Sequence, residues 1–174
     1  MSLETGQGAE DGVFGGYAPP RERPPFGAYA GFTAAFNAAF AGALAAAGRS
    51  GRLPERIEPS DVVLVGIATH KLSRLVTKDK VMAFARAPFT EYREPGGAGE
   101  VEEGARGNGL RKAIGELLVC PYCLGLWTSA GMHAGLLFAP RVTRTVASTF
   151  TALALADFLQ IAYKAAEDRG LGGS

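Results

Sequence analysis

Apolar and polar residues occupy separate long blocks of this 174-residue chain. Residues 117–140 contain no Asp, Glu, Lys or Arg, and residues 26–48 form a second uncharged block. A membrane-spanning helix needs about 20 mostly apolar residues, because the hydrocarbon core is about 30 Å thick and each helical residue rises about 1.5 Å. Both blocks reach that length, so the pattern predicts membrane-spanning helices. A long buried helix in a soluble protein is the alternative interpretation of each block.

The full pattern predicts four helices, over residues 26–48, 61–76, 110–139 and 142–164. The second has an apolar first half, but its second half carries His70, Lys71 and Arg74. Its uninterrupted apolar core, residues 62–69, covers only about 12 Å at helical rise, so we expect a short or partially inserted helix. The predicted fold is therefore an all-α integral membrane bundle with three full spans plus this shorter helix.

The regions outside these helices are polar and rich in glycine. Residues 1–25 mix Gly, Pro and charged residues without periodicity, which predicts a disordered tail and no cleaved targeting segment. Residues 77–109 are predicted to form a long loop, and residues 167–174 a flexible tail. The membrane domain is thus expected over residues 26–166.

Charge distribution predicts an orientation and excludes one class of partner. The chain has 18 basic and 17 acidic residues, so its net charge of +1 gives no general attraction to nucleic acid. Residues 71–112 hold nine Lys or Arg, the largest basic count in any connection, and the positive-inside rule places loop 77–109 in the cytoplasm. If helix 61–76 spans, both chain ends are cytoplasmic. If it only dips into the bilayer, the amino end lies outside.

Cys120 and Cys123 are the only cysteines, in the sequence Cys-Pro-Tyr-Cys. Pro121 suits the first position of a helix, and a cysteine at a helix N-terminus gains thiolate character from the helix dipole. The tetrapeptide resembles the glutaredoxin active site, but the flanking sequence is of membrane type. Two interpretations stay open: a thiol–disulfide redox pair in which both cysteines are catalytic, and two reduced, packed thiols.

A Cys and His metal site is a further alternative, with zinc as the metal. His133 lies ten residues beyond Cys123, about 15 Å along the same helix, so it cannot share an ion with both thiols. His70 fits better, which gives Cys120, Cys123 and His70 as candidate ligands; a zinc site usually takes four. Without that site we expect no cofactor.

Asp157 is the one acidic residue within the apolar part of helix 142–164. An ionised carboxylate in hydrocarbon costs a few kcal/mol, so it should face the bundle and find a cation. Lys71 or Arg74 is the expected partner, which makes a buried polar cluster. Small residues in the central block would let another helix approach closely, so a protein partner or a second copy of the chain is expected there, with the lipid bilayer around it.

Three stretches together resemble a known family: ATHKLSRLVTKDKV (68–81), RAPFTEY (86–92) and LRKAIGELLVCPYCLGLW (110–127). They are similar to the bacterial membrane family named domain of unknown function 1360, some members of which are described as sporulation proteins. The resemblance covers about residues 60–164 and implies a small multi-pass protein of the bacterial cytoplasmic membrane, of unassigned activity. It transfers no catalytic residue. The leading hypothesis is a non-enzymatic membrane or envelope-associated component, with the redox and metal functions as alternatives.

Overall fold

The computed structural model describes residues 16–19 and 24–171. Most of the predicted amino-terminal tail and the last residues of the predicted carboxy-terminal tail lie outside this range. The elements in chain order are α1 (Phe26–Arg49), α2 (Pro59–Thr77), η1 (Lys80–Met82), α3 (Ala83–Arg86), β1 (Thr90–Pro95), β2 (Val101–Ala105), α4 (Gly109–Val119), α5 (Pro121–Phe138) and α6 (Pro140–Leu171). The four long helices α1, α2, α5 and α6 overlap the four predicted ones.

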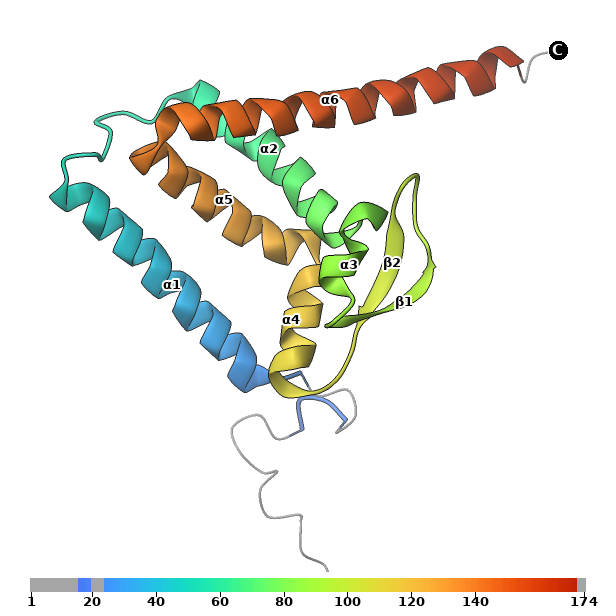
Figure 1. Ribbon diagram of the computed structural model, residues 1–174, viewed down its shortest axis with the longest axis horizontal. Helices are drawn as coiled ribbons and strands as arrows, with labels where there is room; N and C mark the ends of the chain where they lie inside the picture. The colour runs from blue at the N-terminus through green and yellow to red at the C-terminus, as the bar shows by residue number, and fades with distance from the viewer. Residues whose placement is uncertain (1–15, 20–23, 172–174) are drawn as a thin grey trace, which may run out of the picture.

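Helix α2 is the centre of the bundle. It packs against both α5 and α6, whereas α1 contacts α5 and α4 (Figure 1). The core cluster contains Val65, Ala68, Met132 and Ala147, which come from α2, α5 and α6. Chain direction reverses at each connection between the long helices. The start of α1, the end of α2 and the start of α4 therefore lie toward one end of the bundle, and the short connections after α1 and α5 lie at the other.

The predicted helix 110–139 is two helices, which is a correction to the sequence prediction. The axes of α4 and α5 are bent by 82°, and Cys120 between them has extended backbone angles (φ −108°, ψ 102°). Pro121 causes this break because it lacks an N–H and disfavours helical angles in the residue before it. The sequence correctly placed Pro121 at a helix start, but α4 does not continue its direction.

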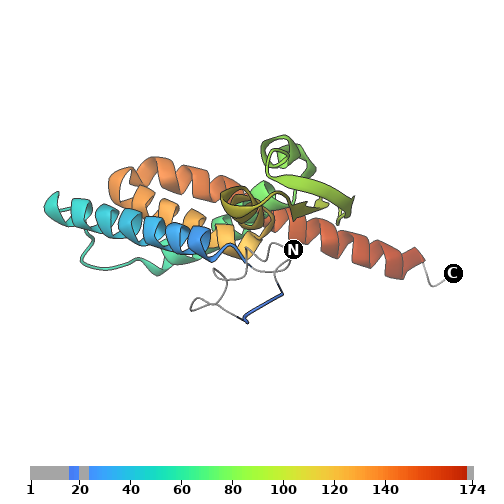
Figure 2. The ribbon, with the colours of Figure 1, turned by 90° about the horizontal axis from the view of Figure 1, so that it is seen from below.

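The predicted loop 77–109 contains a β-hairpin, so the all-α prediction was wrong. Strands β1 and β2 pair antiparallel from Thr90 opposite Ala105 to Pro95 opposite Val101, with a bulge between Tyr92 and Glu94. Figure 2 shows the hairpin standing out from one side of the helices. Its turn closes through a hydrogen bond from the Gly96 N–H to the Glu100 carbonyl. The strands are short and carry many charged residues, so they lack the alternation of apolar and polar positions by which a strand is predicted from sequence.

Two helices, α1 and α6, are long and apolar enough to cross a membrane, and the bent pair α4–α5 is a third if it counts as one span. Helix α2 does not qualify among the described residues. Three full spans plus a partial one are therefore not confirmed, although the chain is mostly helical with candidate membrane helices. Large apolar side chains on the outer half of α6 are exposed, including Leu155, Phe158, Leu159 and Ile161. Such a surface is typical of contact with lipid.

Candidate functional site

Cys120 and Cys123 lie at the bend between α4 and α5, with their sulfur atoms at disulfide distance. The Cys123 backbone N–H donates to Cys120 Sγ over 3.1 Å, so the Cys120 side chain caps α5. The Tyr122 side chain between them is 91% exposed. A sulfur at a helix N-terminus with a backbone donor is stabilised as a thiolate when reduced. This arrangement can support thiol–disulfide exchange.

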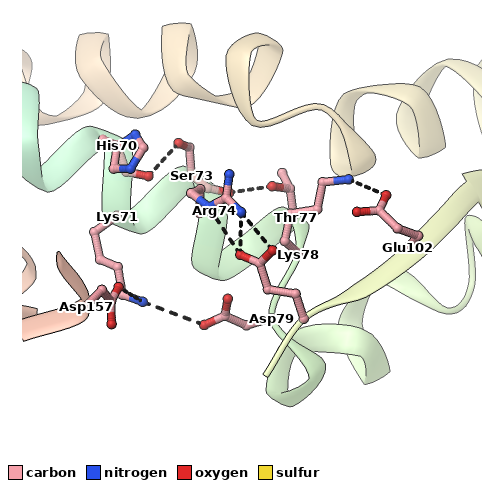
Figure 3. A network of polar contacts seen from close by, with 10 residues as sticks. His70, Lys71, Ser73, Arg74, Thr77, Lys78, Asp79, Glu102 and Asp157 are labelled. Carbon is pink, nitrogen blue, oxygen red and sulfur yellow. Dashed lines mark hydrogen bonds and ion pairs between the residues drawn. The ribbon is translucent and has the colours of Figure 1, made fainter. Parts of the chain in front are cut away.

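In the second group of predicted residues, Lys71 and Arg74 lie along the last turns of α2, and Asp157 approaches from α6 (Figure 3). Lys71 Nζ lies 2.8 Å from an Asp157 carboxylate oxygen and 4.0 Å from Asp79. The Lys71 side chain is 15% exposed and that of Asp157 is 48% exposed. The structure therefore brings Lys71 and Asp157 together, with the carboxylate half-buried at the side of the bundle.

Arg74 pairs with the hairpin instead of with Asp157. Its guanidinium donates to both carboxylate oxygens of Glu100, with Nη2 distances of 2.6 and 2.7 Å. One turn further, Lys78 Nζ lies 2.7 Å from Glu102 (Figure 3). Lys78 directly follows α2, four residues after Arg74, so the two side chains lie on the same side and hold Glu100 and Glu102 of the hairpin.

A buried ion pair continues this line of contacts, and the sequence prediction missed it. Arg86 Nε lies 2.6 Å from Glu103, with side chains only 1% and 7% exposed. Arg86 Nη1 also donates to the carbonyl oxygens of Val76 and Asp79, and the Thr90 hydroxyl donates to Glu103. Nothing in the pattern marked Arg86 as buried, because an arginine in a charged loop is ordinarily solvated.

Asp79 lies where these contacts meet, just beyond the end of α2. Burial raises the pKa of Asp79 above its ordinary value of 3.8, and the carboxylates of Glu100 and Asp157 also raise it, whereas Lys71 and Arg74 lower it. The cluster thus places three carboxylates near two cations, and burial disfavours the charged form of Asp79.

The residues predicted as metal ligands do not form a ligand set. His70 stacks beside Phe158 of α6, with 6.4 Å between ring centroids. In the part of the chain that the structure describes, no three His, Cys, Asp or Glu side chains are placed to hold a metal ion. His133 Nδ1 lies 2.9 Å from the Ser129 carbonyl oxygen, one turn earlier on its own helix.

At the opposite end of the bundle, Arg144 forms a bidentate pair with Asp61, at 2.9 and 2.7 Å. This pair joins the start of α6 to the start of α2.

Some of the small residues at which a protein partner was expected instead pack against other helices of this chain. A Cβ on Gly135 would lie 2.5 Å from Thr143 Oγ1, and Gly125 lies beside Thr69.

The sequence profile of the family described as "Protein of unknown function (DUF1360)" matches residues 64–163. This match runs from α2 through the hairpin to α6 and covers more than half of the chain, so the chain belongs to that family, as the resemblance predicted. The chain is also similar to Sporulation protein YjcA of Bacillus subtilis (strain 168), at 41% identity over 69 residues. The alignment covers 38% of this chain and 58% of that relative's length. No solved structure matches.

Proposed function

We propose that this member of the family is a multi-pass protein of the bacterial cytoplasmic membrane, a non-enzymatic, envelope-associated component that presents its hairpin to a protein partner. The observation that carries the proposal is the line of ion pairs from α6 through α2 to β2: Lys71 with Asp157, Arg74 with Glu100, and Lys78 with Glu102. A hairpin held in this way keeps a fixed position relative to the membrane helices. The support for a role in sporulation is the name of the relative alone.

The orientation follows from charge and chain direction. Nine Lys or Arg residues between positions 71 and 112 support a cytoplasmic hairpin. The long helices alternate in direction, which supports both chain ends on that same side. The exposed strand β1 offers Tyr92 beside charged residues, a composition suited to a protein partner and ill-suited to lipid.

Site-directed labelling tests this arrangement. In a Cys120→Ser/Cys123→Ser background, one new cysteine is placed on the hairpin (Glu94→Cys) and a matched one in the opposite connection (Glu55→Cys). A membrane-impermeant maleimide should label position 55 in intact cells and position 94 only after lysis. Labelling of position 94 in intact cells, or release of the protein from membranes by alkaline carbonate, would overturn the proposal.

A second candidate function is thiol–disulfide exchange, favoured by the pairing of Cys120 with Cys123 and by the Cys123 N–H donor on Cys120. The pair is on the hairpin side, and the proposed orientation therefore places it in the reducing cytoplasm. The Cys120 thiolate would attack a disulfide of a partner protein, forming a mixed disulfide and releasing one partner thiolate. The Cys123 thiolate would then attack Cys120, releasing the second. The partner is reduced by two electrons, and the pair is oxidised until a cytoplasmic thiol reductant restores it.

Trapping separates this candidate from packed thiols. With a model disulfide peptide, Cys123→Ser should accumulate a mixed disulfide at Cys120, whereas Cys120→Ser should accumulate far less. Alkylation of reduced wild type should remain fast below the pH at which an ordinary thiol ionises. Slow alkylation of reduced wild type, together with no trapping in either variant, would exclude the redox function and leave the membrane proposal intact.

A further inference from the structure

A cavity of about 660 Å³ lies between α1, α5 and the connection that follows α1. Its wall is mostly apolar, with Phe36 and Phe40 from α1 and Leu126 and Leu137 from α5. Small residues, among them Ala130, leave the space open on the α5 side. The volume is in the range of sites that hold small organic ligands.

Two side-chain contacts join the first half of α1 to α4 and α5. The Tyr29 hydroxyl donates to Glu116 near the start of α1, and Phe36 packs edge-to-face on Trp127, with 5.3 Å between centroids. Beyond these contacts α1 and α5 continue in the same general direction (Figure 1). Residues of both helices line the cavity. In a bilayer, an apolar space at this place is accessible to lipid chains.

The rim of the cavity is cationic. It contains three arginines, Arg52, Arg56 and Arg144, and two carboxylates, Glu58 and Asp61. Arg144 and Asp61 neutralise each other. Arg52 donates to the Phe138 carbonyl over 3.3 Å and lies over the Phe138 ring. Within the described part of the chain, neither Arg52 nor Arg56 has a carboxylate oxygen within 4.0 Å, so two guanidinium groups are left for an external anion.

We propose that this cavity binds an anionic phospholipid of the surrounding bilayer, with its phosphate on Arg52 and Arg56 and one acyl chain along the apolar wall between α1 and α5. Guanidinium groups bind phosphate through paired, charge-assisted hydrogen bonds, and the wall suits a hydrocarbon chain. The inference rests on the proposed membrane location. It adds a specific lipid class, and it places the lipid at the opposite end of the bundle from the hairpin.

Native mass spectrometry of the full chain tests the proposal. The protein is stripped of lipid in detergent and then offered phosphatidylglycerol or phosphatidylcholine with the same acyl chains. One phosphatidylglycerol should remain bound per chain, with phosphatidylcholine retained about tenfold less, and Arg52→Gln/Arg56→Gln should reduce phosphatidylglycerol retention to the same level. The control Arg93→Gln/Arg169→Gln removes two arginines outside the cavity and should change nothing.

A second variant examines the apolar wall. Ala130→Leu fills part of the cavity and should lower the retention of both lipids, whereas inorganic phosphate should not displace the bound lipid. Equal retention of the two lipids by wild type, displacement by inorganic phosphate, or full retention by Arg52→Gln/Arg56→Gln would overturn the inference. Failure of the lipid proposal would leave carbonate resistance and hairpin protection unchanged, so it is distinguishable from failure of the membrane proposal.

Discussion

The two ends of the helical bundle differ in how their charged side chains are paired. At the hairpin end, charged side chains are buried or half-buried and paired, from Lys71 with Asp157 to Arg86 with Glu103. At the other end, Arg52 and Arg56 lie at the rim of an apolar cavity, and among the described residues neither has a carboxylate oxygen within 4.0 Å. Buried charges fix geometry because breaking one pair leaves the other charge desolvated. The comparison therefore indicates a rigid end suited to presenting a surface and an open end suited to receiving a ligand.

The largest expected effect comes from the buried ion pair. Arg86→Met removes the cation from Glu103 and the donor from two carbonyl groups, and should lower the free energy of unfolding by about 3–5 kcal/mol. The measurement is equilibrium unfolding in mixed micelles. Arg56→Met is the matched change at the cavity end and should cost less than about 0.5 kcal/mol. Equal costs at the two positions would remove the contrast between the ends.

The next largest expected effect on stability concerns the close packing of the α4 backbone against neighbouring segments. A Cβ added at Gly115 in α4 would meet the Phe89 carbonyl oxygen and the Cβ of Ala105 at 2.9 Å, so Gly115→Ala should destabilise by about 1–3 kcal/mol. Gly42 in α1 has nothing within 4 Å of its added Cβ. Gly42→Ala should therefore be neutral or stabilise by up to about 1 kcal/mol. Thermal unfolding of both variants checks this, and an equal loss would show that the hairpin is not packed tightly on α4.

Lys71 lies beside two carboxylates, so removing the lysine and removing one carboxylate should lower the free energy of unfolding by different amounts. Lys71→Met removes the cation that lies beside both Asp157 and Asp79, and leaves only the more weakly acting Arg74 for Asp79, whereas Asp157→Asn leaves Lys71 with Asp79. The lysine variant should therefore lose about 1 kcal/mol more unfolding free energy than the aspartate variant. At the cavity end, Arg144→Met and Asp61→Asn break a simple pair and should cost similar amounts. A symmetric result at Lys71 would mean that Asp79 does not interact with it.

The smallest effect concerns Asp79 and pH. Since the folded pKa is raised above 3.8, the folded state holds the proton more tightly than the unfolded chain. The resulting stability is fully present below pH 3.8 and is lost as the pH rises through the raised value. Relative to Asp79→Asn, wild type should become slightly less stable over that interval and then stay level. A difference of opposite sign would show that Lys71 and Arg74 outweigh burial.

Residue pattern alone determined the location of the long helices, the helix start at Pro121, the family and the basic stretch before α4. These follow from local rules: apolar block length, proline geometry and charge counts. Tertiary structure decided the 82° bend, the hairpin with its register, and the choice of Glu100 over Asp157 as the partner of Arg74. Pairing between residues far apart in sequence depends on how the helices pack, and several carboxylates lie within reach of each cation until packing selects one. The cavity likewise is lined by residues far apart in sequence, from α1, α5 and the connection after α1, so packing alone brings them together.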